Sequence, residues 1–140
     1  DVVTGGPPCQ GVSGFNLFRD RQDADDKNRQ TLVFAEMCEL QQPRFAIMEN
    51  VVGILMFNSS YVLKRCMAHF LARDYQVSVG VCVSGTFGLP QNRARTILFA
   101  ARADVPLPRY PKPTHRPQDV PISMMTSWMR EHLLNMPTAE

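Results

Sequence analysis

Strand patterns alternate with helix patterns along this chain, and this alternation limits the possible folds more than any other feature. The runs Phe45–Met48 and Thr96–Ala100 are short, continuous and apolar, as in strands that are buried on both faces. Residues 76–83 alternate valines with smaller or polar residues, which is the period of a strand. Asp1–Thr4 is a further, truncated strand pattern. The order predicts an α/β fold with a largely parallel sheet.

Two segments between these strands have the spacing of helices. The first runs from Asn28, a possible N-cap, to Leu40, with Pro43 shortly beyond its end. The second begins at Ser59 or Ser60 and extends to residue 73, with its apolar residues at helical intervals. If the strands before and after it are parallel neighbours, the first helix is the connection between them.

The last third of the chain has a different composition. Residues 106–121 contain six prolines, so this stretch should be extended and irregular, a linker or surface arm. Residues 123–136 could form a closing helix, with their methionines, Trp128 and Leu133 facing inward.

Composition bounds the function. The 140 residues are 44% hydrophobic and 20% charged, which suits one soluble globular domain or a piece of one, and no apolar run is long enough to span a membrane. The net charge of +2 is too small to predict nucleic-acid binding by itself. The four cysteines lack paired spacing and a histidine cluster, so we predict no metal site and a reducing compartment.

Cys9 has the setting of a nucleophile. It stands on the turn Gly5–Gln10, where two glycines permit unusual backbone angles and two prolines fix φ. This turn follows a strand directly, and functional residues gather at the carboxyl ends of parallel strands. An incidental cysteine on an ordinary turn is the alternative for this motif taken alone.

Glu49 is expected at the same edge of the sheet, because it ends the second strand pattern. A carboxyl group there should be partly desolvated, which favours its acid form. Arg93 and Arg95 lie two residues apart at the entry to a later strand, so both should project to one face and could bind an electron-rich group. Each of these residues alone could be a surface or salt-bridge residue, but their order at strand ends favours chemistry.

These residues resemble the motifs of the DNA (cytosine-5) methyltransferase family. Gly6–Gly14 resembles its nucleophile motif, Met48–Val51 its Glu-Asn-Val motif, and Gln91-x-Arg93-x-Arg95 its Gln-x-Arg-x-Arg motif. Finer features, including Pro108–His115, point to the plant-type chromomethylase branch. The resemblance implies a partial Rossmann-like fold of the S-adenosylmethionine-dependent methyltransferases, with only its central strands and helices.

The resemblance also implies roles for single residues. The thiolate of Cys9 would add to C6 of a flipped cytosine in double-stranded DNA, and Glu49 would bind the N3 and exocyclic-amine edge of that base. Arg95, assisted by Arg93, would contact the base near O2. The remaining assignments are Gln10, Ser13 and Gln91 to DNA, Pro8 and Leu32 to the cofactor S-adenosylmethionine, Leu32 at the opening of the first helix, and Asn50 to fixing the loop around Glu49.

The resemblance divides the chain into a partial catalytic domain (1–101), a proline-rich linker (102–121) and a possible helix opening a recognition region or a divergent end (122–140). The family's glycine-rich cofactor motif and its ribose-binding acid have no counterpart here, so residues 1–140 alone are expected to be inactive. The implied location is the nucleus, with a role in epigenetic silencing and chromatin partners for domains outside this sequence.

Three other functions compete. An RNA cytosine-5 methyltransferase shares the Pro-Cys-Gln and Glu-Asn-Val motifs, but Gly11–Gly14 and the long loop predicted over Arg19–Asn28 look DNA-type. A non-catalytic DNA-binding relative would have no need of Cys9. A cysteine hydrolase would need a histidine base, and none of the three histidines is paired with Cys9 in the pattern.

Overall fold

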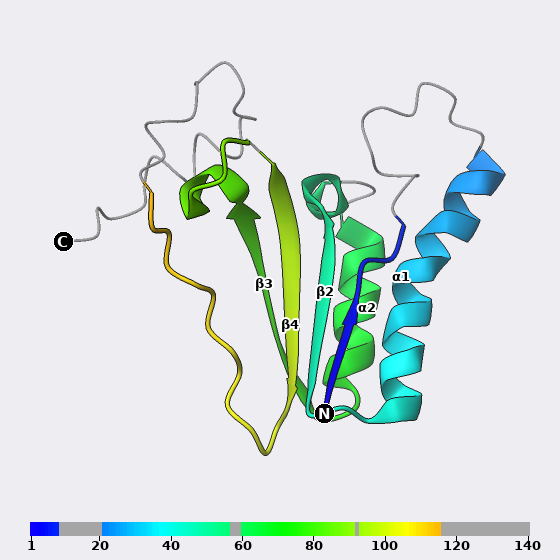
Figure 1. Ribbon diagram of the computed structural model, residues 1–140. Helices are drawn as coiled ribbons and strands as arrows, with labels where there is room; N and C mark the ends of the chain where they lie inside the picture. Colours follow the sequence, from blue (N-terminus) through cyan, green and yellow to red (C-terminus); the bar gives the residue numbers. More distant parts are fainter. Residues whose placement is uncertain (9–20, 57–59, 92, 116–140) are drawn as a thin grey trace. The chain divides into compact units, whose positions relative to one another are not determined.

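The computed structural model describes residues 1–8, 21–56, 60–91 and 93–115, with residues 21–28 as backbone. Within these ranges the elements follow in the order β1 (Val2–Gly5), α1 (Arg21–Gln41), β2 (Phe45–Val51), η1 (Val52–Leu55), α2 (Tyr61–Leu71), β3 (Tyr75–Val83), η3 (Ser84–Phe87) and β4 (Ala94–Arg102), where η marks a short 3-10 helix (Figure 1).

The strands form one mixed sheet in the order β1-β2-β4-β3. β1 and β2 are parallel, with Gly5 opposite Met48, and α1 is the crossover between them. β2 and β4 are antiparallel, so the prediction of a largely parallel sheet is wrong for this pair. A period-two pattern is the same in both directions, which is why the sequence did not reveal the reversed strand.

Helix α1 begins at Arg21, seven residues before the predicted N-cap Asn28. Leu32 therefore lies in the middle of α1. The prediction that it stands at the opening of this helix is wrong. The helix ends as predicted: Gln42 adopts φ 44°, its amide donates to the carbonyl of Cys38, and Pro43 follows.

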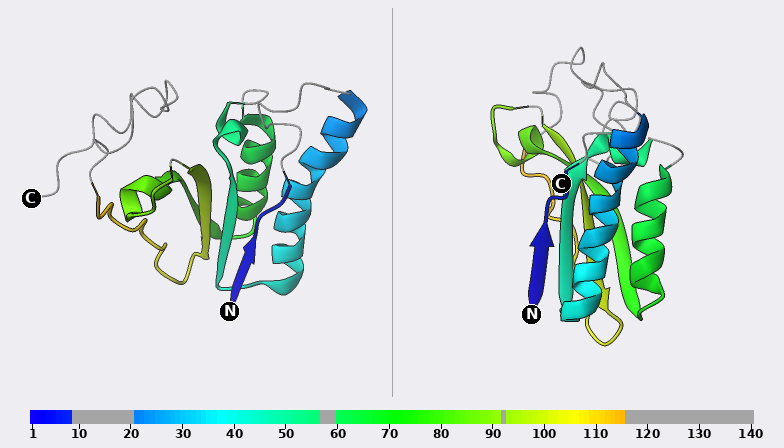
Figure 2. Two further views of the ribbon diagram at one scale, coloured as in Figure 1. Left: turned by 45° about the horizontal axis from the view of Figure 1, so that its top comes forward. Right: turned by 90° about the vertical axis from the view of Figure 1, so that its right-hand side faces the viewer.

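The core lies between one face of the sheet and the two packed helices α1 and α2 (Figure 2). Alternate residues of β2 and β4 point into it, among them Met48 and Leu98, which are fully buried. Phe34, Phe70 and Tyr75 form a chain of aromatic contacts across it, with ring centroids 6.4 and 5.5 Å apart. Residues of β2 between the buried positions, including Glu49, consequently face the other side of the sheet.

Tyr110 holds the proline-rich segment against that other side. Its ring packs on Phe99 at 4.7 Å and lies over Gly80, where an added Cβ would approach ring carbons to 2.8 Å. Its hydroxyl lies 2.7 Å from the carbonyl oxygen of Ile97 and 3.1 Å from that of Ser78. Residues 106–113 contain no helix or strand.

By its contacts the chain divides into two compact units, Asp1–Val81 with Arg95–Tyr110, and Cys82–Ala94 with the chain from Pro111 onward. The whole sheet face that carries Glu49 belongs to the first unit. The turn η3 and the segment Gln91–Arg93 belong to the second. The predicted helix over 123–136 lies outside the described residues.

Candidate functional site

The turn after β1 runs beside the end of β2, as the positions of Cys9 and Glu49 in the sequence predict for parallel neighbours. Gly5 pairs with Met48, so the next residue, Gly6, comes alongside Glu49. A Cβ added to Gly6 would lie 3.6 Å from a carboxylate oxygen of Glu49. The absence of a side chain therefore leaves the backbone of the turn directly next to the carboxylate.

Asn50 ties this turn to the sheet. Its side chain is 2% exposed, its Nδ2 donates to the carbonyl oxygen of Pro7 (3.3 Å), and its Oδ1 accepts from the amide of Val51 (2.8 Å). A buried amide that satisfies two backbone groups fixes their separation, because breaking either bond leaves a polar group without a partner. Pro7 is thereby anchored two residues before Cys9 in the sequence.

Glu49 forms an ion pair across the strands. Its Oε1 lies 2.7 Å from Nε of Arg95, and the two side chains are 46% and 24% exposed. Val51 is opposite Arg95 and Glu49 is opposite Ile97, so the pair is a diagonal one on a single face of the sheet. The carboxyl group of Glu49, which was expected to be desolvated, is thus half-exposed and paired with a guanidinium.

The segment with the other two predicted residues, Gln91 and Arg93, is organised by Ser84. The Ser84 hydroxyl lies 2.8 Å from the carbonyl oxygen of Gln91 and accepts from the amide of Arg93 (3.0 Å). The Ser84 amide donates to the carbonyl of Arg93, also at 3.0 Å. Gln91 and Arg93 are exposed, so their side chains face solvent from a loop whose backbone is closed on itself.

The remaining predicted site residues are divided. Cys9, Gln10 and Ser13 lie outside the described residues. Pro8 is exposed beyond the end of β1, whereas Leu32 is half-buried and packs against the core cluster.

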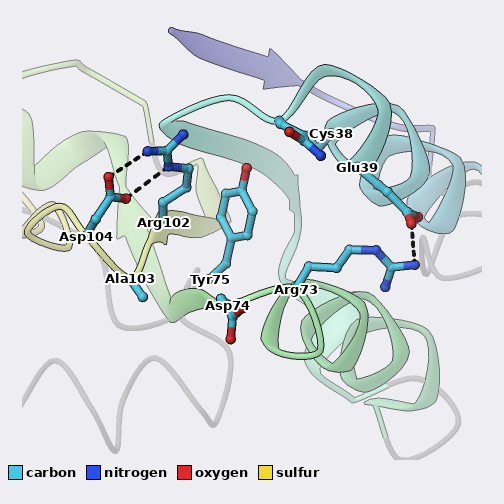
Figure 3. Close-up of a pocket in the computed structure, with 9 residues that line it drawn as sticks. Cys38, Glu39, Arg73, Asp74, Tyr75, Arg102, Ala103 and Asp104 are labelled. Atoms are coloured by element: carbon cyan, nitrogen blue, oxygen red, sulfur yellow. Dashed lines mark hydrogen bonds and ion pairs between the residues drawn. The ribbon is translucent and has the colours of Figure 1, made fainter.

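A cavity of about 430 Å³ opens at the opposite end of the first unit, where α1 and β4 end and β3 begins (Figure 3). Arg102 forms a double hydrogen bond with Asp104, at 2.9 and 2.6 Å, on one side of Tyr75. Arg73 and Glu39, 2.7 Å apart, lie on the other side. These pairs hold the pKa of Glu39 and of Asp104 below their usual values, because each carboxylate accepts hydrogen bonds from its arginine.

Several polar groups of this cavity already have partners. Each guanidinium pairs with a carboxylate, and the hydroxyl of Tyr75 donates to the carbonyl of Pro43 at 2.6 Å. Within the described ranges, no three histidine, cysteine, aspartate or glutamate residues are placed to hold a metal ion, and no helix is long and apolar enough to cross a membrane.

The thiols of Cys38 and Cys66 are buried in the core, and this sets them apart from a nucleophile. Burial raises the pKa of Cys38 to about 11 and that of Cys66 to about 12. Cys82 is half-buried, and burial raises its pKa as well. A thiol that stays protonated is a poor nucleophile.

Sequence reasoning missed two features of the site. Asn50 was assigned to the loop around Glu49, and beside its bond to the amide of Val51 it makes an unpredicted bond to Pro7 in the turn after β1. Ser84 was not singled out, because a serine seven residues before Gln91 carries no pattern that predicts their contact. A long-range hydrogen bond of this kind has no signal in a single sequence.

The model of the C-5 cytosine-specific DNA methylase family matches residues 1–135. The chain belongs to this family. DNA (cytosine-5)-methyltransferase 3 of Zea mays is 44% identical over 117 residues, and DNA (cytosine-5)-methyltransferase CMT3 of Arabidopsis thaliana is 43% identical over 117. These alignments confirm the predicted resemblance to plant enzymes of the chromomethylase branch. They cover 82% of this chain but only 13% and 14% of the two relatives.

The solved structure of the Entamoeba histolytica methyltransferase EhMeth has the same fold, with a TM-score of 0.56 at 20% identity. The match covers 79% of this chain and 34% of that one. The predicted fold class, a partial Rossmann-like methyltransferase fold, is confirmed.

Proposed function

We propose that the protein containing this chain transfers a methyl group from S-adenosylmethionine to C5 of cytosine in double-stranded DNA. The observation that carries the proposal is the anchored turn after β1: Gly6 is packed beside Glu49 and Pro7 is bonded to Asn50. Glu49, with its partner Arg95, thus lies beside the turn that leads to Cys9 in the sequence. The family membership and the plant relatives support the same function.

The chemistry begins with a nucleophile, because C5 of cytosine is too electron-poor to take a methyl group directly. The thiolate of Cys9 forms a bond to C6, and the electron pair of the C5–C6 double bond moves to make C5 nucleophilic. After C5 has gained the methyl group, loss of the C5 proton restores the double bond and expels the thiolate. The target cytosine must be flipped out of the duplex, since C6 is not accessible within the stack.

Glu49 and Arg95 act as a unit on the base in this proposal. Glu49 presents its carboxyl group to the N3 and exocyclic-amine edge and stabilises the electron-rich ring that forms after thiolate addition. The 2.7 Å bond to Arg95 fixes the orientation of that carboxyl group. The fork of a guanidinium has five N–H donors, so Arg95 can hold Glu49 and approach O2 of the base together, with Arg93 assisting.

Among the described residues, those assigned to S-adenosylmethionine, Pro8 and Leu32, could form only one side of its binding site. Pro8 is exposed at the edge that carries Glu49 and can supply apolar contact, whereas Leu32 uses part of its surface on the core. Neither side chain has a polar group for the ribose or the amino-acid part of the cofactor. When bound, the cofactor supplies the methyl group; Pro8, and Leu32 where it is exposed, would form part of one wall of its site.

The finer assignments follow from this function. We assign Gln10, Ser13 and Gln91 to contacts with DNA, of which the exposed Gln91 is the one within the described residues. We place the whole protein in the nucleus, where its DNA substrate is, with a role in epigenetic silencing through chromatin-binding domains outside this sequence.

The test is covalent trapping with the full-length protein. The protein is mixed with S-adenosylmethionine and duplex DNA that carries 5-fluorocytosine in different sequence contexts. Fluorine at C5 cannot leave as the proton does, so the enzyme should stay bonded to the DNA. Cys9→Ala should abolish the adduct, and the matched Cys82→Ala variant should retain it.

Other outcomes identify the competing functions. An adduct on structured RNA but not on DNA would replace the proposal with an RNA cytosine-5 methyltransferase. No adduct on either nucleic acid, with DNA binding retained, would mean a non-catalytic relative. An adduct that survives Cys9→Ala would contradict the assignment of the nucleophile.

A further inference from the structure

The turn η3 and the residues that follow it are held from outside by the segment that ends at His115. The carbonyl oxygen of Thr86 accepts from two consecutive amides, those of Thr114 (2.9 Å) and His115 (3.0 Å). Thr86 itself is buried, and its hydroxyl donates to the carbonyl of Val83 at 2.8 Å. A carbonyl with both lone pairs used in this way fixes the arriving segment at one point.

The ring of His115 covers Gly88. This glycine has φ 86°, a left-handed conformation that ends η3, and a Cβ added to it would meet the ring at 2.7 Å. Nδ1 of the ring lies 2.9 Å from the hydroxyl of Thr114, which sets the ring plane. Gly88 thus allows the backbone conformation of the turn, and the ring of His115, a largely exposed residue, covers the turn.

The same turn leads directly into the segment with Gln91 and Arg93. The amide of Leu89 donates to the carbonyl of Ser84 at 3.3 Å, and the Ser84 hydroxyl contacts the backbone of Gln91 and Arg93. The hydroxyl of Ser84 thus bonds to the backbone of this loop, and the ring of His115 covers the loop at Gly88. All of these contacts lie in the second compact unit.

We infer that His115 is a positioning residue that sets the Gln91–Arg93 segment for contact with DNA, an inference that rests on the proposed function. His115 acts through the turn at Gly88 and does not itself touch the base. Misplacement of a substrate-positioning segment by about 1 Å can cost a hundred-fold in rate. The Thr86 carbonyl and the His115 ring both hold this loop, so we expect removal of the ring to let the loop move by about that distance.

The experiment compares variants of the full-length protein in steady-state methylation and in hydrogen exchange. His115→Ala should raise KM for DNA about ten-fold and leave KM for S-adenosylmethionine unchanged. Amide exchange in peptides spanning residues 84–91 should become faster. His115→Phe, which restores a flat ring over Gly88, should recover most of both effects. His69→Ala is the matched control, since it removes a histidine from α2 and should change neither quantity.

A double-mutant cycle tests whether the ring acts through Gly88. Gly88→Ala should impair DNA use, and His115→Ala in that background should add little, because the added methyl group has already displaced the ring. Fully additive effects would overturn the inference, as would unchanged exchange in His115→Ala or equal rises in both KM values. If the wild-type protein methylates no DNA, the proposed function fails, and the exchange data alone decide whether His115 holds the turn.

Discussion

The two ends of the first unit both carry arginine–carboxylate pairs, and only one end has the form of an active site. Near the carboxyl end of β2, Glu49 pairs with Arg95 at 2.7 Å across two strands. At the other end, Arg73 pairs with Glu39 at the same distance, and Arg102 pairs with Asp104 two residues away. The distances and the residue types therefore do not distinguish the two ends.

The difference lies in what adjoins each pair. Gly6 and the turn that leads to Cys9 lie beside Glu49, and Asn50 anchors that turn. The pairs at the other end join helix ends and a turn to each other and face a cavity lined by Cys38, a thiol whose pKa is raised by burial. Exposed ion pairs contribute little to stability, so neither end needs its charges for folding. An ion pair thus marks a functional site when a second element brings a reactive group to it.

Exchanging carboxylates for amides at the two ends should give the largest contrast. Glu49→Gln keeps the shape of the side chain but removes the acid and weakens the pairing with Arg95. In the full-length protein it should lower kcat for DNA methylation about a hundred- to ten-thousand-fold, the range for loss of a positioned acid or base. Glu39→Gln, the matched change at the other end, should leave kcat within about two-fold, because surface pairs of this kind are worth little.

Steady-state methylation and 5-fluorocytosine trapping measure this contrast, with circular dichroism to show that both variants are folded. Equal losses of activity at both ends would remove the distinction between them. Full activity of Glu49→Gln would exclude Glu49 from the chemistry.

The fold was predictable wherever one periodicity settled the element. The strands at residues 45–51 and 94–102 and helix α2 follow from apolar spacing alone. The start of α1 was not predictable from the sequence, because its first two turns are polar and apolar residues recur only after Asn28. The direction of β4 could not be predicted from the sequence either, since strand direction depends on the connection between strands and not on the alternation of side chains.

The site was predictable to the level of neighbouring strand ends. Parallel pairing of β1 and β2 follows from the crossover helix, and it places Glu49 beside the turn before Cys9. The partner of Asn50 was not predictable, because Pro7 lies 43 residues earlier and its carbonyl has no sequence signature. The ion pair between Glu49 and Arg95 was also missed, since it depends on the register of an antiparallel neighbour.

Two amide side chains, the buried Asn50 and the half-buried Gln76, provide a second, smaller test of the comparison. Asn50→Ala removes the bond to Pro7, and Gln76→Ala removes bonds to the carbonyls of Arg102 (3.3 Å) and Val105 (2.9 Å) at the other end. Each should lower the free energy of unfolding by about 1–2 kcal/mol, because backbone groups lose their partners. Only Asn50→Ala should also lower kcat, by about ten-fold or more, since it releases the turn before Cys9.

Denaturant unfolding and steady-state methylation of the full-length protein separate these effects. A loss of activity in Gln76→Ala as large as in Asn50→Ala would show that activity follows stability and not the position of the turn.

The thiols of the core give the smallest effect and contrast with the proposed nucleophile. Burial raises the pKa of Cys38 to about 11 and that of Cys66 to about 12, from 9.0. Between about pH 9 and 11 the unfolded chain loses these protons while the folded chain keeps them. Stability from the buried thiols is therefore complete below about pH 9 and falls as pH rises, by about 1.4 kcal/mol per pH unit for each thiol.

Denaturant unfolding at pH 8, 9 and 10 measures that slope, and the Cys38→Ala/Cys66→Ala double variant should have a shallower one. Lysines and tyrosines titrate in both proteins, so the difference in slopes isolates the two thiols, whatever the double variant loses in absolute stability. Equal slopes would mean that the core thiols ionise as readily as they do in the unfolded chain. In that case burial would not account for a difference in reactivity between Cys38 or Cys66 and the nucleophile that we propose, Cys9.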